Sequence, residues 1–166
     1  MQKIQIYELP LGKLTFVSDG LALTGIWFDK QEPLQQILKA PHEVCNLPIF
    51  DETRLWFDTY FNGQQPGFTP RLSLIGTAFR QQVWRNLQLI PYGETTSYGT
   101  LAKQIGQQLG KNKMSAQAIG GAVGNNPISI IVPCHRVVGT NGTMTGYAGG
   151  IWKKEFLLDL EAKNRR

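Results

Sequence analysis

A cysteine and a histidine stand side by side in the stretch SIIVPCHRVVGT, residues 129–140. The thiolate is the reactive form of cysteine, and a neighbouring cation favours the thiolate over the thiol. His135 and Arg136 are both placed to act on Cys134 in this way. Because adjacent side chains of an extended backbone point apart, we expect a bridging water to carry the proton between sulfur and imidazole. The motif predicts a nucleophilic cysteine.

The other cysteine, Cys45, lies in the stretch HEVCNLP and is interpreted as an inert thiol. The chain holds two cysteines and two histidines, has no CxxC pair, and separates Cys45 and His42 widely from Cys134. This spacing disfavours zinc, and we expect neither a metal nor a cofactor. Low cysteine usage without a signal peptide favours free thiols in a reducing compartment, so a cytoplasmic location is expected.

Composition limits the size and class of the molecule. With 166 residues and 42% hydrophobic composition, the chain can form one sizeable core and a small further domain. The N-terminal residues alternate between apolar and polar types, and no stretch approaches the roughly 18 apolar residues of a membrane span. We therefore expect neither export nor a membrane. A net charge of +5 with 17% charged residues is compatible with a polyanionic partner.

The elements of the first part predict a small antiparallel sheet domain with a helix. Alternating patterns between turn signals indicate strands at residues 3–9, 13–18 and 21–29. Helical spacing behind an aspartate cap indicates a helix at 51–61. A connector rich in proline and glycine follows, so we place this domain at residues 1–75.

The second part, residues 76–166, predicts a helical domain that carries the cysteine. Apolar spacing indicates helices at 78–89, 97–106 and 115–124, the last two each behind a serine cap. These two capped helices predict a helix-turn-helix. The apolar run at 128–132 is interpreted as a short buried strand that leads to the cysteine. The predicted fold class is therefore α+β, with a sheet domain before the helical one.

Two glycines in the interior of the second capped helix indicate a close approach to its backbone. Gly120 and Gly121 each cost roughly 1 kcal/mol there relative to alanine. Either another element of the protein packs against this face, or the face enters a nucleic-acid groove. The composition does not decide between these two interpretations.

Residues 126–161, from NPISIIVPCHR to FLLDLE, resemble the active-site block of the O6-alkylguanine-DNA alkyltransferases. The stretches GTAFRQQVWRNLQLIPYGETTSYGTLA and MSAQAIGGAVGNNP resemble the helical segments of that family. The resemblance implies a DNA-repair protein that moves the alkyl group of O6-methylguanine, and also of O4-methylthymine, irreversibly to Cys134. It further implies flipping of the damaged base, single use of each molecule, and a monomer bound to double-stranded DNA that carries O6-alkylguanine.

The resemblance also implies a role for individual residues. His135 and Glu161 correspond to a relay through water, and Tyr98 to a tyrosine that donates to the base. With Cys134, these are the expected catalytic residues. The expected substrate-binding residues are Asn126, Val137, Tyr147, Ala148, Gly149 and Lys154. The expected DNA-binding residues are Ser115, Gln117, Ala118, Gly121 and Arg136.

One position departs from the family pattern. Many members carry an arginine in the recognition helix that fills the space of the extruded base, and this chain has Gln117 there. Glutamine can hydrogen-bond the orphaned base but lacks the charge and reach of arginine. We expect weaker flipping, or a larger contribution from Lys111 and Lys113 in the preceding loop.

Two alternatives belong to other classes of function. A non-catalytic helix-turn-helix protein that binds or flags alkylated DNA shares every feature except the thiol, so Cys134 disfavours it. A cysteine–histidine hydrolase also needs a thiolate, but it turns over repeatedly on acyl substrates and uses an oxyanion hole that the sequence does not identify.

Overall fold

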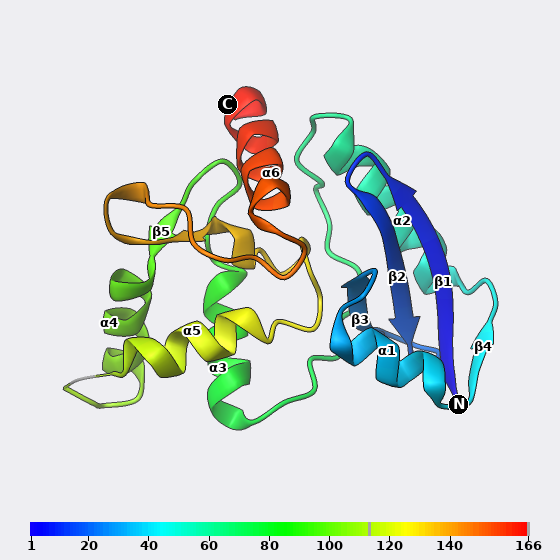
Figure 1. Cartoon of the computed structure of the whole chain (residues 1–166), viewed down its shortest axis with the longest axis horizontal. Coiled ribbons are helices and arrows are strands. Elements are labelled where there is room, and N and C mark those ends of the chain that lie inside the picture. The colour runs from blue at the N-terminus through cyan, green and yellow to red at the C-terminus, as the bar shows by residue number, and fades with distance from the viewer. Residues whose placement is uncertain (113, 166) are drawn as a thin grey trace. The chain divides into compact units, whose positions relative to one another are not determined.

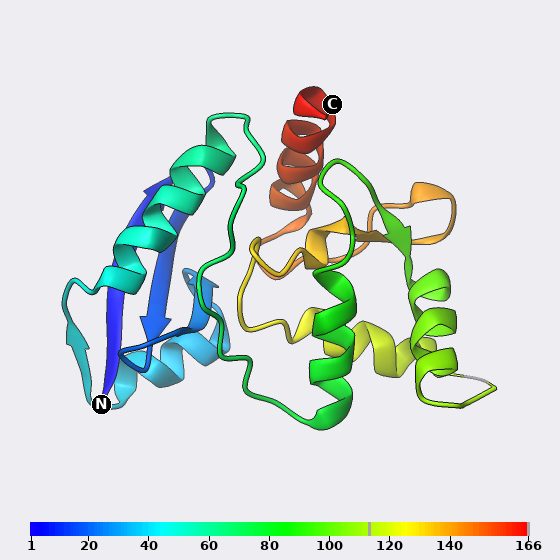
Figure 2. The same cartoon turned by 180° about the vertical axis from the view of Figure 1, so that it is seen from behind.

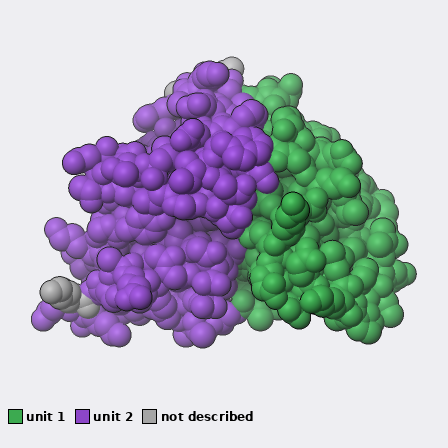
Figure 3. Space-filling model, viewed as in Figure 1, with its two compact units in different colours: residues 1–75, 127–129 green, residues 76–126, 130–166 purple. Residues whose placement is uncertain are grey.

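The computed structural model describes residues 1–112 and 114–165. The chain forms two compact units (Figure 3): residues 1–75 with 127–129, and residues 76–126 with the chain from residue 130 onward. Among the described helices, none is both long enough and apolar enough to span a bilayer. The predicted class, α+β with a sheet part before a helical part, is confirmed.

Unit 1 contains a four-stranded mixed sheet with the strand order β3-β2-β1-β4 (Figure 1). Strands β1, β2 and β3 are antiparallel, as predicted, but β4 pairs in parallel with β1. The purely antiparallel sheet was therefore wrong, because the sequence analysis missed the short β4 and the helix α1 that crosses over to it. The elements of unit 1 are β1 (Gln2–Leu9), β2 (Gly12–Ser18), β3 (Leu23–Phe28), α1 (Glu32–Lys39), β4 (His42–Val44) and α2 (Pro48–Phe61).

Both faces of this sheet are covered, which explains why β2 is buried at every residue from Leu14 to Ser18. On one face, the Phe16 ring stacks with Phe57 of α2 at 5.5 Å between centroids. On the other face, Val17 belongs to a cluster with Leu34 of α1. Helix α2 runs along the sheet in Figure 2. A strand buried on both faces does not alternate cleanly, and only its β-branched and aromatic content identifies it.

Helix α2 begins earlier than predicted. It starts at Pro48 rather than Asp51, and the side chain of its N-cap residue, Leu47, makes no capping hydrogen bond. Proline suits the first turn of a helix because that turn leaves its backbone N–H groups without helical partners. Asp51 instead lies within the first turn, where a carboxylate is favourable to the helix dipole.

In unit 2 the helices α3, α4 and α5 pack against one another. Helices α4 and α5 form the predicted helix-turn-helix (Figure 1). Ser97 accepts a hydrogen bond from the Thr100 amide at 3.0 Å, and Ser115 accepts one from the Ala118 amide at 3.2 Å, so both predicted caps are confirmed. The elements of unit 2 are α3 (Ala78–Leu87), β5 (Thr96–Ser97), α4 (Tyr98–Gln108), α5 (Ala116–Gly124), the 3₁₀ turns η1 (Cys134–Arg136) and η2 (Thr140–Gly142), β6 (Val137–Val138) and α6 (Ile151–Asn164).

Two helix ends differ from the prediction. Helix α3 ends at Leu87, before Leu89, where the chain turns through a hydrogen bond from the Leu89 amide to the Asn86 carbonyl. Helix α4 continues past Gly106 to Gln108. The residue with positive φ that ends the turn is Gly110, at 67°.

Residues 128–132 do not form the expected strand. The stretch has only isolated bridge residues, including a bridge between Ile128 and Ile26, and it turns at Ile130, whose φ is 73°. A β-branched residue rarely adopts positive φ, and such strain persists only where the surrounding packing enforces it. Ile130 is 1% exposed, so its burial outweighs its backbone preference. The apolar run reflects a buried turn that leads to the cysteine.

Candidate functional site

The cysteine sits at the start of a tight turn whose backbone is tied to the preceding residues. The Cys134 amide donates to the Val132 carbonyl at 2.8 Å, and the Arg136 amide donates to the Pro133 carbonyl at 3.0 Å. The Asn126 side chain donates to the same Val132 carbonyl at 2.7 Å. This geometry holds the half-buried Cys134 between the end of the helix-turn-helix and the strand β6.

The surroundings of the Cys134 thiol have opposing effects on its pKa. Burial raises the pKa of Cys134, whereas a hydrogen bond from Asn126 and the charge of Lys154 lower it, and the net shift is upward. The cation that favours the thiolate is thus Lys154, rather than His135 or Arg136 as the sequence suggested. A raised pKa leaves the resting group as a neutral thiol, which needs a base to become a nucleophile.

His135 is placed to be that base. Its ring is fully buried, Nε2 lies 2.6 Å from Oε2 of Glu161, and Nδ1 has no hydrogen-bond partner among the described residues. Burial lowers the pKa of His135 more than the neighbouring Glu161 raises it. A neutral imidazole that donates from Nε2 keeps its lone pair on Nδ1, so Nδ1 can accept a proton.

The Glu161 carboxylate lies at the centre of a buried hydrogen-bond network. Besides His135, it accepts from Nε and Nη2 of Arg136 at 2.8 and 3.2 Å, and from the Gly93 amide at 3.1 Å. Burial pushes the pKa of Glu161 upward, but the bonds from His135 and Arg136 outweigh it and hold the pKa at about 2. Glu161 lies on the buried face of α6, together with Leu157.

Arg136 is buried in this network. Its Nη1 donates to the Ile90 carbonyl at 2.7 Å, and its guanidinium lies 5.7 Å from the centre of the Tyr92 ring. Arg136 was expected among the DNA-binding residues. In the structure its guanidinium has internal partners, the Glu161 carboxylate and the Ile90 carbonyl.

A second polar network joins three elements of unit 2. The parallel pair β5–β6 sets Tyr98, the first residue of α4, near the cysteine turn. Its hydroxyl lies 3.1 Å from Oγ1 of Thr145. Lys154, 1% exposed in the first turn of α6, donates to Thr145 at 3.0 Å and to the Val137 carbonyl at 2.6 Å. Thr145 was missed, because a threonine in a Gly- and Thr-rich loop gives no sequence signal.

The loop expected to surround the base leads into α6. Tyr147 and Gly149 are half-buried, and Ala148 is exposed. The Gly150 amide donates to the Tyr147 carbonyl at 2.8 Å, and Gly150 has a φ of 106°. Burial raises the pKa of Tyr147, so its hydroxyl remains protonated. Val137 contributes its backbone carbonyl, through the bond from Lys154.

The second helix of the helix-turn-helix presents a small and open surface. The expected DNA-binding residues on or beside α5 are exposed, namely Ser115, Gln117, Ala118 and Gly121. A Cβ atom placed on Gly120 or Gly121 meets no atom within 4 Å, so no element of the described chain packs against these glycines. This removes one of the two interpretations of the glycines. Lys111 is exposed, and Lys113 lies outside the described residues.

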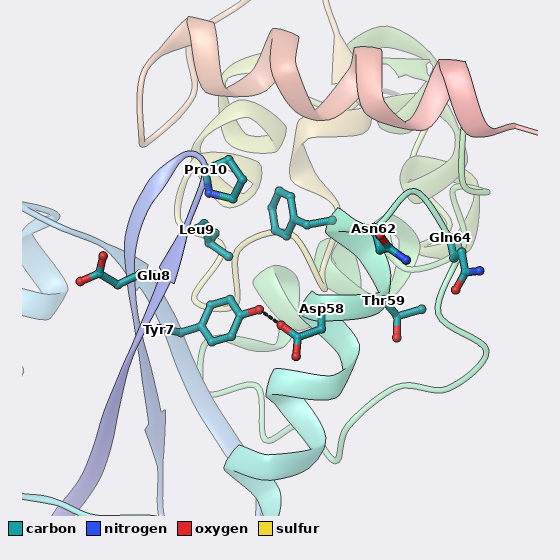
Figure 4. A pocket seen from close by; sticks show the side chains of 9 residues that line it. Tyr7, Glu8, Leu9, Pro10, Asp58, Thr59, Asn62 and Gln64 are labelled. Atoms are coloured by element: carbon teal, nitrogen blue, oxygen red, sulfur yellow. Dashed lines mark hydrogen bonds between the residues drawn. The ribbon is translucent and has the colours of Figure 1, made fainter.

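Two features lie apart from this chemistry. In the described part of the chain, no three His, Cys, Asp or Glu side chains gather in a way that could hold a metal ion. A cavity of about 470 Å³ in unit 1 lies between β1 and α2, where Tyr7 hydrogen-bonds Asp58 (Figure 4). Its lining contains no cysteine or histidine, so we assign it no part in the chemistry.

Two family models cover nearly the whole chain. Residues 3–74 match the ribonuclease-like domain of 6-O-methylguanine DNA methyltransferases, and residues 78–163 match their DNA binding domain. The methylated-DNA–protein-cysteine methyltransferase of Haemophilus influenzae is 45% identical over 158 residues, 93% of this chain and 83% of that protein. The protein of the same name from Methanosarcina acetivorans is 42% identical over 156 residues, 94% of this chain and 96% of that protein.

Solved structures give the same result. The O6-methylguanine methyltransferase of Mycobacterium tuberculosis matches with a TM-score of 0.85 and 40% identity, over 100% of this chain and 96% of that one. A structure of Mycobacterium tuberculosis OGT in complex with DNA matches with a TM-score of 0.85 and 40% identity, over 98% of this chain and 94% of that one.

Proposed function

Because the chain belongs to the methylated-DNA–protein-cysteine methyltransferases, a family of DNA-repair proteins, we propose that its Cys134 accepts the alkyl group from O6-alkylated guanine. The family reaction is alkyl transfer from DNA to a cysteine of the protein itself. The observation that carries the assignment to Cys134 is the buried His135, the next residue in the chain, whose Nε2 bonds Glu161 and whose Nδ1 has no partner among the described residues. Near Cys45 in sequence, Nδ1 of His42 instead pairs with the Ala40 carbonyl.

The proposed reaction is a substitution at the alkyl carbon. His135 removes the thiol proton of Cys134 through the expected bridging water, and the sulfur bonds to the alkyl carbon while the bond from that carbon to O6 breaks. The electron pair of the broken bond stays on the guanine, which takes a proton from Tyr98. Tyr98 later regains a proton from water, and His135 releases its own. The products are guanine and a stable thioether, so each molecule reacts once.

Glu161 and Arg136 act through His135 in this scheme. An ionised Glu161 accepts the Nε2 proton and thereby fixes the tautomer in which Nδ1 is the base. It also stabilises the imidazolium that forms when the thiol proton is transferred. Arg136 and the Gly93 amide hold the carboxylate in place from the other side. We therefore propose Arg136 as a positioning residue and not as a DNA contact.

DNA is the partner of this protein, and we propose that α5 enters its groove. The open glycine face allows the backbone of α5 to approach sugar and phosphate closely. Base flipping costs a few kcal/mol of lost stacking. We propose that Gln117 contacts the space left by the base and that Tyr147, Ala148 and Gly149 border the flipped base.

We further propose that O4-methylthymine is a second substrate, that the protein acts as a monomer, and that it works in the cytoplasm. A monomer fits the chemistry because one cysteine accepts one alkyl group and the proposed site is made of residues of one chain. The low cysteine content supports the location.

Mass spectrometry after mixing the protein with a duplex that contains one O6-methylguanine tests the assignment. We expect one added methyl group per chain, located on the peptide with Cys134, and none with Cys134→Ser. A methyl group on Cys45 would contradict the assignment. Unmodified protein that still retains the damaged duplex would instead indicate a non-catalytic binder, and repeated turnover of a thioester would indicate a hydrolase.

A further inference from the structure

The geometry points to Thr145 as a positioning residue that fixes the direction of a hydrogen-bond chain from Lys154 to Tyr98. This inference rests on the proposed function, because it concerns how Tyr98 gives a proton to the departing base. It adds a residue from the loop between η2 and α6 to the site. The chain joins the start of α4, this loop and the first turn of α6.

Each contact in the chain has a defined geometry. Nζ of Lys154 lies 3.0 Å from Oγ1 of Thr145, and Oγ1 of Thr145 lies 3.1 Å from the Tyr98 hydroxyl. Nζ also lies 2.6 Å from the Val137 carbonyl, an oxygen that can only accept. Two acceptor oxygens therefore bind the ammonium group of Lys154, and the burial of this side chain restricts its rotamers.

The chemistry of the ammonium group sets the direction of the first bond and leaves the hydroxyl proton of Thr145 available for the second. An ammonium group donates and cannot accept, so the bond between Lys154 and Thr145 runs from Nζ to Oγ1. The hydroxyl proton of Thr145 is then free to point to the Tyr98 oxygen. With its oxygen accepting from Thr145, Tyr98 keeps its own proton for the substrate. If the bond between the two hydroxyls ran in the opposite direction, Tyr98 would donate its proton to Thr145 and not to the substrate.

The same direction stabilises Tyr98 after it has donated. The phenolate oxygen left behind accepts the hydrogen bond from Thr145, and the Lys154 ammonium strengthens that bond by polarising the Thr145 hydroxyl. Tyr98 then recovers its proton from water. Tyr98 and Lys154 each bond the hydroxyl of Thr145, which therefore links them.

The methyl group of Thr145 contributes to its orientation. A Cβ atom built on Gly139 would lie 3.2 Å from Cγ2 of Thr145, which shows that the methyl group packs closely against the backbone there. A β-branched side chain is restricted at χ1, and this contact restricts Thr145 further. Serine retains the hydroxyl at this position without that restraint, and valine retains the shape without the hydroxyl.

The test measures single-turnover transfer of the benzyl group from free O6-benzylguanine to the protein, followed by intact mass. The free base separates the chemical step from binding to DNA. The variants are Thr145→Val, Thr145→Ser, Tyr98→Phe and the double variant Thr145→Val with Tyr98→Phe. The matched control is Thr143→Val, because Thr143 lies in the same loop but its hydroxyl donates to the Thr140 carbonyl.

We expect Thr145→Val to react about 10- to 100-fold more slowly than the wild type, the range for loss of a hydrogen bond to a charged group. Thr145→Ser should recover most of that rate, and Thr143→Val should leave the rate unchanged. The double variant should be no slower than Tyr98→Phe, since Thr145 acts only through Tyr98.

Two results would overturn the inference: a Thr145→Val rate equal to the wild-type rate, or a double variant in which the two losses multiply. If Thr145→Val does not fold, Thr145→Ala removes the same hydroxyl without adding bulk and carries the same comparison. A wild-type protein that accepts no methyl group from the O6-methylguanine duplex would contradict the proposed function instead, so the two failures are distinguishable.

Discussion

The sulfur of Cys134 is subject to opposing influences that the adjacent histidine alone does not explain. Burial favours the thiol, whereas Asn126 and Lys154 favour the thiolate. A buried thiol that stays neutral at rest is protected from solution electrophiles and oxidants, which act on thiolates. The proton is removed when an acceptor is available, and Nδ1 of His135 provides one. The reactivity of this residue therefore depends on the network behind His135.

That dependence leads to a prediction for Arg136→Met. Arg136 stabilises Glu161 and, through its own charge, lowers the pKa of His135. Without Arg136, the pKa of His135 rises, so His135 is protonated at higher pH and cannot accept the thiol proton. The acid limb of the rate of alkyl transfer should move to higher pH, as measured by single-turnover transfer from O6-benzylguanine across a pH series.

Stability should change as well in this variant. Removal of one partner from a buried ion pair costs about 3 kcal/mol, because a charge is left without compensation. Urea unfolding should show this loss for Arg136→Met, whereas Arg80→Met, at an exposed position of α3, should be nearly neutral. An acid limb that does not move in Arg136→Met would show that the guanidinium does not act on His135.

The sequence named candidate residues for the site but not the contacts between them. Cys134, His135, Glu161 and Tyr98 follow from the motif and the resemblance. The guanidinium of Arg136 pairs with a residue from α6, and Thr145 belongs to the site because it hydrogen-bonds Tyr98 and Lys154. Such contacts depend on the packing of segments distant in sequence, and no local spacing specifies them.

At the scale of elements, α5 combines a weak helical sequence with an open surface. Its glycines disfavour a helix, yet no atom of the described chain occupies the space that side chains at Gly120 and Gly121 would fill. The helix is held on its other side, where Ile119, Ala122 and Val123 are buried. The Trp84 indole of α3 also donates to the Ala122 carbonyl at 2.9 Å. Packing within unit 2 thus offsets the low propensity and leaves one face bare.

Gln117 on this helix is the basis of a second prediction. Gln117→Arg adds a cation to the exposed surface that we propose enters DNA, so duplex affinity should rise several-fold at low salt and depend more steeply on salt, by roughly one released counterion. Fluorescence anisotropy with a labelled duplex at several salt concentrations measures both. The reaction with free O6-benzylguanine should not change, because Gln117 is an exposed residue of α5, whereas the buried His135 bonds Glu161.

The control is Gln65→Arg, which adds the same charge at an exposed position of unit 1. Equal gains in affinity for both variants would mean that net charge alone matters and that Gln117 has no special position. No gain for Gln117→Arg would remove α5 as the DNA-reading helix.

Elements with strong local signals were predicted well, and those that depend on distant packing were not. The caps at Ser97 and Ser115 are local and were correct. The short strand β4 exists because it pairs with β1, and helix α1 because it covers the sheet. The buried run 128–132 turns at Ile130 instead of extending, because burial alone does not distinguish a strand from a turn.

At the scale of the whole molecule, a net charge of +5 is combined with a buried network that depends on one ionised carboxylate. As pH falls, exposed carboxylates become neutral and the positive charge of the folded protein grows, which disfavours the compact state. The buried titratable groups also contribute to the pH dependence of the free energy of unfolding. The sign of each contribution follows from the difference in proton binding between the folded and unfolded states.

Glu161 and His135 both make the protein sensitive to acid. The pKa of Glu161 is about 2 in the folded state against an ordinary 4.5, so its contribution is present above pH 4.5 and is lost as pH falls toward 2. That difference corresponds to about 3 kcal/mol. The pKa of His135 is lowered from its ordinary 6.5. Below pH 6.5, His135 therefore binds a proton in the unfolded chain but stays neutral in the folded chain, which lowers the stability of the folded state.

We therefore expect the free energy of unfolding to fall below pH 6.5 and to fall more steeply below pH 4.5. Chemical denaturation at a series of pH values from neutral to acid measures the slope. Glu161→Gln cannot titrate at this position and should lose the steeper acid part, although it is less stable at neutral pH because Arg136 and His135 lose a charged partner. Glu155→Gln, at an exposed position of the same helix, should keep the wild-type slope. Equal slopes below pH 4.5 for Glu161→Gln and the wild type would mean that the acid sensitivity arises from surface charge alone, and that the carboxylate of Glu161 is not held ionised by its buried partners.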